Sequence, residues 1–305
     1  MYDVIIIGGS YAGMSAAMQV ARARRRVAVI DAGMRRNRFA TASHGFLGRD
    51  GHAPGLIAEE AKAQLMAYPT VDWIVGTAIQ ASGTIDDFRI TTDTGRVVSG
   101  RRVVLATGVE DVLPDVPGLA GQWGVGAMTC PYCHGYELDM GPVGVLATSQ
   151  NSIHQAMLLP EWGTTTFFTD NAVTLDTDTS ADLARRGVTI EETPVAAIDG
   201  DPGSPLVRLE DGRRIEIAGL FVATSVRMAS PVAEMLGCTF GDSPFGSIIA
   251  VDAMKATSVP GVIACGDVTR GAGSVALSVG DGALAGTMVH RSLVFPETVE
   301  TNKAA

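Results

Sequence analysis

The sequence predicts an α/β protein of two Rossmann-like, three-layer ββα domains of the dinucleotide-binding type, with the second domain inserted in the first. Three stretches of the chain predict this class. An apolar strand over residues 3–7 runs through a glycine-rich turn into a helix, and a second strand-helix-strand unit spans 143–169. Near the C-terminus, a strand and turn over 262–268 lead into a helix of small residues over 274–293. A length of 305 residues, twice the usual domain size, agrees with two domains.

The order of these stretches predicts a first domain that is interrupted and then resumed. We expect residues 1–112 and 241–305 to form this first domain, and residues 113–240 to form the insert. Pro114 and Pro117 mark the connection into the insert, because proline ends regular strands and helices. The most closely spaced cysteines of the chain then belong to the insert.

Composition and charge exclude several classes of protein. Hydrophobic residues make up 46% of the chain and charged residues 18%, which excludes a disordered chain. The formal net charge of −10 argues against a nucleic-acid partner, and the one dense basic run, over 22–26, suits the C-terminal end of a helix. No apolar run approaches the roughly 18 residues of a membrane span, and the run from Val4 to Ile7 is too short for a signal peptide. We therefore expect a cytoplasmic enzyme without membrane attachment.

The glycine turn after the first strand indicates an adenine dinucleotide site. It is Gly8-Gly9-Ser10-Tyr11-Ala12-Gly13, so the middle glycine of the usual G-x-G-x-x-G turn is Ser10. Glycines there let the backbone approach a pyrophosphate, which the helix N-terminus stabilises, and a small serine still permits that approach. Asp31, at the end of the second strand, is placed to accept hydrogen bonds from a ribose. A tight turn that binds no ligand is the weaker alternative.

A second motif, Cys130-Pro131-Tyr132-Cys133-His134, predicts redox chemistry. Two cysteines at this spacing interconvert between dithiol and disulfide, and the thiolate is the attacking form. A structural zinc site is the weaker alternative and we expect no metal, because Cys238 and Cys265 are isolated in apolar surroundings typical of the core. His134 is a candidate general base for the leaving thiol, or an imidazolium that stabilises a thiolate. We therefore expect Cys130, Cys133 and His134 to be the catalytic residues.

In this order, the motifs resemble the low-molecular-weight thioredoxin reductase family of flavoproteins over nearly the whole chain. The resemblance rests on the glycine turn with Asp31, on Ala106-Thr107-Gly108, on the CxxC inside an insert, and on Gly266-Asp267-Val268 followed by a helix. It implies a homodimer with FAD as cofactor, in which Cys133 faces the flavin and Cys130 exchanges with substrate. The residues that it places at FAD are Gly8, Gly9, Ser10, Gly13, Asp31, Ala106, Thr107, Gly108, Gly266, Asp267, Val275 and Ala276.

The insert departs from the thioredoxin reductase pattern at its own nucleotide turn. A second G-x-G-x-x-A turn is required there, but the stretch 145–152 contains no glycine. The side chains of Thr148, Ser149 and Gln150 would crowd a pyrophosphate, and Asp170 after the next strand would repel a 2′-phosphate. The sequence therefore argues against NADPH binding in the insert.

A second departure is His134, where thioredoxin reductases typically carry Asp. With the loop from His44 to Gly51, the run Cys-His-Gly-Tyr-Glu is similar to the dithiol oxidases of the gliotoxin and holomycin type. That resemblance implies an FAD-dependent dithiol oxidase that forms a disulfide in a small-molecule natural product, with O2 as acceptor giving H2O2. The missing nicotinamide turn is what such a mechanism predicts.

Two other hypotheses remain open. The chain is alternatively a disulfide reductase that takes electrons from ferredoxin or from an atypically bound NAD(P)H, and the direction of electron flow separates this hypothesis from the oxidase. A flavin-carrying redox sensor or binding protein is a hypothesis of a different class. Flavin that dithiols fail to reduce at useful rates would favour the sensor.

Overall fold

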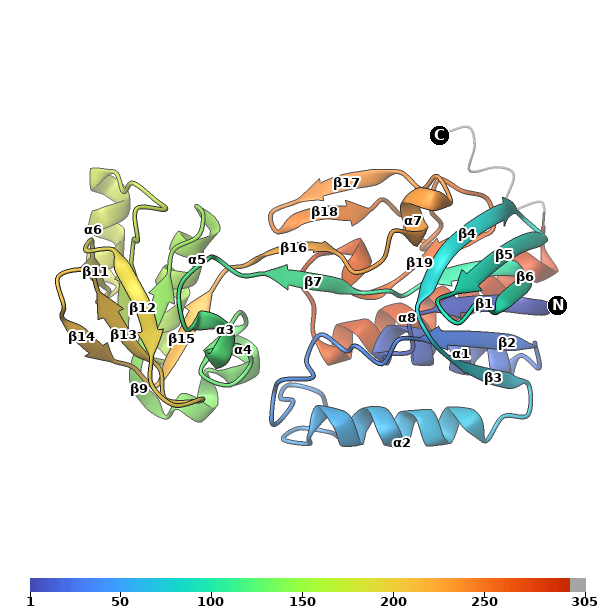
Figure 1. Ribbon diagram of the computed structural model, residues 1–305, viewed down its shortest axis with the longest axis horizontal. Helices are drawn as coiled ribbons and strands as arrows, with labels where there is room; N and C mark the ends of the chain where they lie inside the picture. Colours follow the sequence, from blue (N-terminus) through green and yellow to red (C-terminus); the bar gives the residue numbers. More distant parts are fainter. Residues whose placement is uncertain (297–305) are drawn as a thin grey trace. The chain divides into compact units, whose positions relative to one another are not determined.

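The computed structural model describes residues 1–296, which divide into two compact units (Figure 1). Unit 1 contains Met1–Arg38, Pro54–Glu110 and the described residues from Val226 on. Unit 2 contains Phe39–Ala53 and Asp111–Ser225. The strands β7 (Val109–Val112) and β16 (Ser225–Met228) pair with each other, and the boundaries of the units fall in these two strands.

These units differ from the expected domain bounds in two places. Unit 2 ends at Ser225 rather than at 240, because Val232 and Cys238 are buried in the core of unit 1. The loop 39–53 groups with unit 2, where Phe39 packs so closely on Gly124 that a side chain at Gly124 would collide with it. The assignment of the units to FAD binding and to a degenerate nicotinamide domain stays a prediction.

Unit 1 is built on a parallel sheet in the order β3-β2-β1-β6, with β19 pairing the second half of β6. The N-terminal half of β6 instead pairs antiparallel with β5, which continues to β4. The strands are β1 (Tyr2–Ile7), β2 (Val27–Asp31), β3 (Val71–Val75), β4 (Ala78–Thr84), β5 (Asp87–Thr92), β6 (Val97–Leu105), β17 (Phe240–Ser243), β18 (Gly246–Ile249) and β19 (Val262–Ala264). Residues 4–7 of β1 are all buried, as is typical of a parallel strand covered on both faces.

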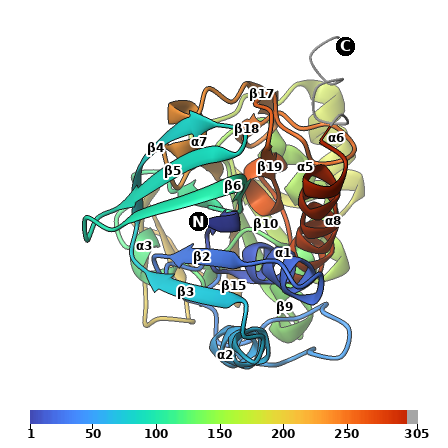
Figure 2. The same cartoon turned by 90° about the vertical axis from the view of Figure 1, so that its right-hand side faces the viewer.

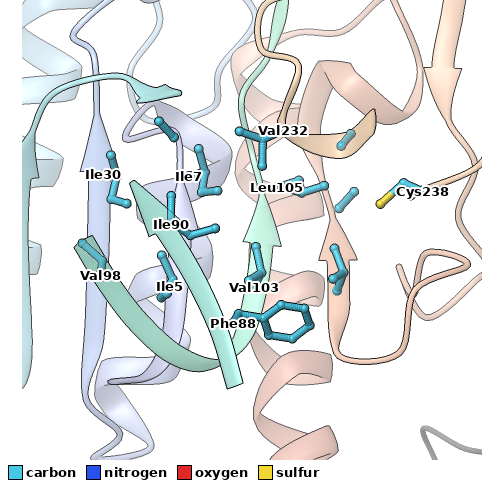
Figure 3. Packing of buried hydrophobic residues seen from close by; sticks show 14 of the residues in the cluster. Ile5, Ile7, Ile30, Phe88, Ile90, Val98, Val103, Leu105, Val232 and Cys238 are labelled. Carbon is cyan, nitrogen blue, oxygen red and sulfur yellow. The ribbon is translucent and has the colours of Figure 1, made fainter. Parts of the chain in front are cut away.

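The helices over 11–22 and 275–294 cover one face of this sheet, and the antiparallel strands lie on the other together with the short helix over 232–235. Ile5 and Ile7 of β1 share a buried cluster with Phe88 and Ile90 of β5 (Figure 3). Ile6 points the opposite way, toward Gly13 at the start of the first helix. This alternation produces the three layers of the predicted ββα arrangement.

The helices of unit 1 are α1 (Tyr11–Arg22), α2 (Pro54–Met66), α7 (Val232–Met235), the short 3-10 helix η3 (Gly266–Thr269) and α8 (Val275–Val294). Figure 2 shows α1 and α8 side by side. Their close approach depends on glycine, because a Cβ at Gly282 would collide with the carbonyl of Ala12 and one at Gly286 with that of Ala16. The small-residue pattern of the last helix is thus explained by packing.

Unit 2 repeats the layered plan around a parallel sheet of order β11-β10-β9-β15-β8. Its strands are β8 (Ala127–Met128), β9 (Met140–Leu146), β10 (Gly163–Phe168), β11 (Thr189–Glu191) and β15 (Gly219–Val222), with an antiparallel meander of β12 (Val195–Asp199), β13 (Leu206–Leu209) and β14 (Arg214–Glu216). Its helices are α3 (Leu119–Gln122), α4 (Pro131–His134), η1 (Tyr136–Leu138), α5 (Asn151–Leu158), η2 (Leu159–Glu161) and α6 (Thr177–Arg185). Leu146 and Phe168 pack toward the meander, and Val145 and Phe167 toward the helices.

The predicted fold class, two Rossmann-like three-layer domains with one inserted in the other, is therefore confirmed. Within residues 1–296, none of the helices combines the length and the apolar character needed to cross a membrane.

Candidate active site

The glycine turn of unit 1 has the close backbone packing that the sequence predicts. Gly8 has a positive φ of 106°, and a Cβ there would collide with the carbonyl of Ala106. A Cβ at Gly13 would collide with the carbonyl of Gly8. Ser10 occupies the N-cap of α1 with an extended backbone, and its hydroxyl makes no capping hydrogen bond to the described residues of the helix. The first-turn amides of α1 therefore keep the arrangement that receives an anion.

Asp31 and Gly9 define a cavity beside this turn. The Gly9 amide donates to Asp31 Oδ1 at 3.1 Å, and a Cβ at Gly9 would approach Trp73 to 2.5 Å. The cavity has a volume of about 270 Å3 and includes Lys62, whose Nζ lies 4.1 Å from the centre of the Trp73 ring. An indole wall, a carboxylate at the strand end and a glycine floor fit the ADP half of FAD. The sequence gave no sign of a role for Trp73, and the fold places it in this wall.

The remaining residues predicted at FAD also lie in unit 1. Ala106 donates its amide to the carbonyl of Ile7 at 2.8 Å, which fixes the Ala106-Thr107-Gly108 turn against β1. Asp267 forms an ion pair with Arg36 at 2.9 Å, and this arginine was not identified from the sequence. The half-buried residues Val275 and Ala276 form the first turn of α8 behind the N-cap Ser274, whose Oγ accepts from Leu277 N.

A buried ion cluster holds the turn that carries Asp267. Asp281 is 7% exposed, and its Oδ2 accepts the Gly266 amide at 2.7 Å. Its other oxygen pairs with Lys255 and with Arg270. Because the carboxylate is almost fully buried, these partners are required to compensate its charge. The cluster therefore fixes the conformation of the Gly266-Asp267 turn.

The cysteine pair sits on the short helix α4 of unit 2. Cys130 is the N-cap, with an extended φ of −104°, and Pro131 starts the helix, a position where its missing N–H is tolerated. The Cys133 amide donates to the Cys130 carbonyl at 3.2 Å, so the two residues share one turn. Both are half-buried. One thiol can thus be reached by substrate while the motif stays held by the fold.

Two contacts that the sequence did not reveal support this helix. Gln155 of α5 is 7% exposed, and its Nε2 donates to the carbonyl of Thr129 at 2.6 Å, directly before Cys130. Tyr132 packs edge-to-face on Trp162 with ring centres 5.2 Å apart. Trp162 is therefore a packing partner of the redox motif.

His134 follows the pair at the end of α4. Burial lowers its pKa below the ordinary 6.5, the nearby Glu137 carboxylate acts in the opposite direction, and His44 lowers it further. A neutral imidazole is therefore favoured, which is the form that accepts a proton.

His44 lies next to this group although it is distant in sequence. Its Nδ1 is 3.3 Å from Glu137 Oε1 and 3.7 Å from Asp50 Oδ1. The loop that carries it is closed by a hydrogen bond from the Ser43 amide to the His52 carbonyl at 2.8 Å. Together with Gly45 and two tyrosines of the redox motif region, these residues line a cavity of about 310 Å3 within unit 2. The sequence analysis identified both the loop and the run 133–137 as family-like features, but it gave no sign that the two meet in one cavity.

The nucleotide turn of unit 2 is closed by its own side chains. The Thr148 amide donates to Ser152 Oγ at 3.0 Å, and Thr148 Oγ1 donates to the carbonyl of Ala223 at 2.7 Å. Asp170, after the next strand, accepts the Val195 amide at 2.8 Å. Burial raises the pKa of Asp170, the Val195 amide lowers it, and Glu210 raises it. This turn offers hydroxyl groups and carboxylates where a nucleotide phosphate requires glycine and cations.

The other two cysteines are core residues. Cys265 is fully buried, and burial together with the Asp281 charge raises its pKa to about 12. Cys238 is 6% exposed and its thiol lies 3.7 Å from Thr257 Oγ1, while burial raises its pKa too. Thiols that resist ionisation are unsuited to exchange chemistry. The catalytic roles of Cys130, Cys133 and His134, and the roles of the individual residues placed at FAD, stay predictions.

Sequence comparison identifies the family. The pyridine nucleotide-disulphide oxidoreductase family matches residues 2–157 and 168–282. Thioredoxin reductase tcpT of Claviceps purpurea (strain 20.1) is 31% identical over 307 residues, which cover 96% of this chain and 94% of the relative. Thioredoxin reductase sirT of Leptosphaeria maculans is 29% identical over 308 residues, covering 95% of this chain and 94% of the relative.

Solved structures agree with the sequence matches. The crystal structure of the oxidoreductase from Agrobacterium tumefaciens is similar with a TM-score of 0.94 at 52% identity, and covers 97% of this chain and 99% of that one. The crystal structure of HlmI is similar with a TM-score of 0.88 at 34% identity, and covers 100% of this chain and 96% of that one.

These matches confirm the predicted resemblance to thioredoxin reductase-like flavoproteins, and FAD is the cofactor. The glycine floor at Gly9 and the carboxylate of Asp31 fit that cofactor. The chain therefore belongs to the pyridine nucleotide-disulphide oxidoreductase family, as an FAD-dependent thiol-disulfide oxidoreductase.

Proposed function

We propose that this enzyme is a dithiol oxidase that closes a disulfide in a small-molecule dithiol of the natural-product type, with O2 as electron acceptor and H2O2 as product. The observation that carries the proposal is the closed turn of unit 2, where Thr148 and Ser152 bond to each other in place of a glycine cradle. An oxidase needs no nicotinamide donor, so such a turn is compatible with its reaction. We further expect a cytoplasmic homodimer, as the resemblance implies.

The cysteine pair would carry out two thiol-disulfide exchanges. A substrate thiol attacks Sγ of Cys130 in the oxidised pair, so that the S–S bond breaks, a mixed disulfide forms and Cys133 leaves as a thiolate. The second substrate thiol then attacks the substrate sulfur of the mixed disulfide. This step releases the product disulfide and leaves Cys130 and Cys133 reduced. FAD, which the Gly9 and Asp31 site of unit 1 would hold, would supply a two-electron acceptor for the reduced pair and a route for these electrons to O2.

His134 is the residue that we propose to move the protons of these exchanges. It follows Cys133 directly in the chain, and its lowered pKa keeps the imidazole neutral and able to accept a thiol proton. A base of this kind is needed because the thiolate, not the thiol, is the nucleophile.

A second candidate function is a disulfide reductase supplied by ferredoxin or by an atypically bound NAD(P)H. The names of the relatives tcpT and sirT, both called thioredoxin reductase, favour it. It requires electrons to flow from a donor through the flavin to the cysteines, the reverse of the oxidase.

The test is dithiol-dependent production of H2O2 in air by the purified yellow protein, with dithiothreitol as substrate. The oxidase requires turnover in the unmodified enzyme and its loss in both Cys130→Ser and Cys133→Ser. Cys238→Ala, in the core of unit 1, is the matched cysteine control and should keep the activity. Absence of peroxide, together with rapid bleaching of the flavin by NADPH, would establish the reductase instead.

A further inference from the structure

The cavity of about 310 Å3 in unit 2 has a position next to the redox cysteines. Tyr132, which lies between Cys130 and Cys133 on α4, forms part of its wall. The complete lining is His44, Gly45, Asp50, Tyr132, Tyr136 and Glu137. A molecule held there would be next to the thiol that exchanges with substrate.

Two exposed aromatic side chains give the cavity its binding surface. Tyr132 is 72% exposed and Tyr136 is 85% exposed, although large apolar rings normally lose such exposure by packing. Ring faces of this kind bind flat amide or heteroaromatic groups, and their hydroxyl groups add hydrogen-bonding capacity.

The cavity lining carries two carboxylates, Glu137 and Asp50, and the imidazole of His44. The Glu137 and Asp50 side chains are 42% and 70% exposed, so both carboxylates face solvent in the cavity. Each contacts His44, and Asp50 Oδ1 also accepts the Gly45 amide at 2.8 Å. Among residues 1–296, no Lys or Arg lines the cavity, and Arg49 of the same loop is not part of it. A substrate carboxylate would meet the two like charges of Glu137 and Asp50, and no Lys or Arg of the described lining faces it.

We propose that this cavity binds the part of the substrate next to its thiols and selects neutral or cationic dithiols with N–H donors over dithiols that carry a carboxylate. Glu137, fixed by His44 at 3.3 Å, is the specificity-determining residue, because its carboxylate accepts N–H groups and repels anions. This inference rests on the proposed function, and it defines the substrate class of that same site.

The test compares dihydrolipoamide with dihydrolipoate, which have the same dithiol and differ only in a terminal amide or carboxylate. The second-order rate of anaerobic flavin reduction is measured for each with the FAD-loaded enzyme. We expect the amide to be preferred roughly tenfold at low salt, with a smaller ratio at high salt because screening weakens the repulsion.

Variants then assign the preference to the cavity. Glu137→Gln should reduce the ratio to about threefold or less, since it removes one of the two charges and keeps the shape. Asp50→Asn provides a second, independent removal of charge. Glu192→Gln, at an exposed position of unit 2 outside the lining, is the matched control and should keep the ratio of the unmodified enzyme.

The outcomes separate this inference from the function on which it rests. Equal rates for the two dithiols, or a ratio unchanged in both Glu137→Gln and Asp50→Asn, overturn the charge selection and leave the dithiol oxidase standing. If neither dithiol reduces the flavin, the proposed dithiol oxidase function is overturned, and the proposed substrate class is overturned as well.

Discussion

Ser152 Oγ accepts a hydrogen bond from the backbone amide of Thr148 at 3.0 Å, in the turn where the second Rossmann-like unit would bind a nucleotide. A nucleotide-binding turn directs such an amide at a phosphate. Here the amide already has a partner on the following helix α5, and the Thr148 hydroxyl is directed to the Ala223 carbonyl at 2.7 Å. Both polar groups of Thr148 are therefore hydrogen-bonded without a ligand.

This contact predicts that NADPH binds weakly or not at all to unit 2. Phosphate would have to displace Ser152 from the Thr148 amide, and it would approach Asp170 without a cation. Calorimetric titration of the FAD-loaded enzyme with NADPH should show no saturable binding in the micromolar range. Asp170→Asn alone should not create binding, because the hydroxyl groups still fill the turn. Saturable micromolar binding to the unmodified enzyme would contradict this account.

Asp31 is predicted to contribute to FAD affinity. Its Oδ1 fixes the Gly9 amide at 3.1 Å, and the carboxylate lines the cavity beside Trp73. Asp31→Ala removes both a charged acceptor and this support, so FAD affinity should fall by about tenfold, or roughly 1.4 kcal/mol. Titration of apoprotein with FAD, followed by flavin fluorescence, measures the change. Asp87→Asn, at the exposed first residue of β5, should bind FAD like the parent, and equal affinity in Asp31→Ala would refute the assignment.

The pH dependence of dithiol oxidation should report His134. Burial lowers its pKa below 6.5, so the folded enzyme keeps the neutral base to lower pH than a free histidine would. Activity should therefore fall on the acid side with a midpoint below 6.5, and His134→Gln should lose that limb along with most of the rate. A limb that persists unchanged in His134→Gln would assign it to another group.

The same shift predicts a stability effect of definite sign. A histidine with a lowered pKa in the folded state binds its proton more readily in the unfolded state. As the pH falls below the unfolded pKa of about 6.5, protonation therefore favours unfolding and the free energy of unfolding decreases. Chemical unfolding over this range should show a shallower loss of stability in His134→Gln than in the parent.

Gln155 is predicted to restrain the redox motif. Its Nε2 bonds the Thr129 carbonyl at 2.6 Å, and Gln155→Leu releases that carbonyl while preserving bulk. Losing about 1 kcal/mol of restraint should raise the alkylation rate of Cys130 by roughly fivefold. The matched control is Gln150→Leu, at the exposed N-cap of α5, which should react like the parent. Alkylation at the parent rate in Gln155→Leu would show that the contact does not restrain the motif.

The sequence predicted the features that depend on local pattern. The strand-turn-helix around Gly8 to Gly13 follows from glycine spacing, and the three-layer fold class follows from hydrophobic periodicity. Both patterns can be recognised from a few residues that are close together in the sequence. The cavity of His44 and Glu137 could not be predicted, because it depends on a loop packing against a helix more than ninety residues away. Gln155 was missed for the same reason, since a glutamine on a helix gives no sign of which carbonyl it reaches.

The end of unit 2 at Ser225 likewise could not be predicted from local sequence patterns. The sequence of residues 226–240 does not indicate to which unit the segment belongs, but Val232 and Cys238 are buried in the core of unit 1. Only the assembled core shows to which unit such a short segment belongs.

The most direct test of the central claim is a stopped-flow measurement without oxygen, in which one preparation of FAD-loaded enzyme is mixed with dithiothreitol and a second portion with NADPH. The dithiol oxidase requires that the dithiol bleaches the flavin at a catalytic rate, that NADPH does not, and that Cys133→Ser abolishes the bleaching by dithiol. Flavin bleached rapidly by NADPH and slowly by the dithiol would contradict the oxidase.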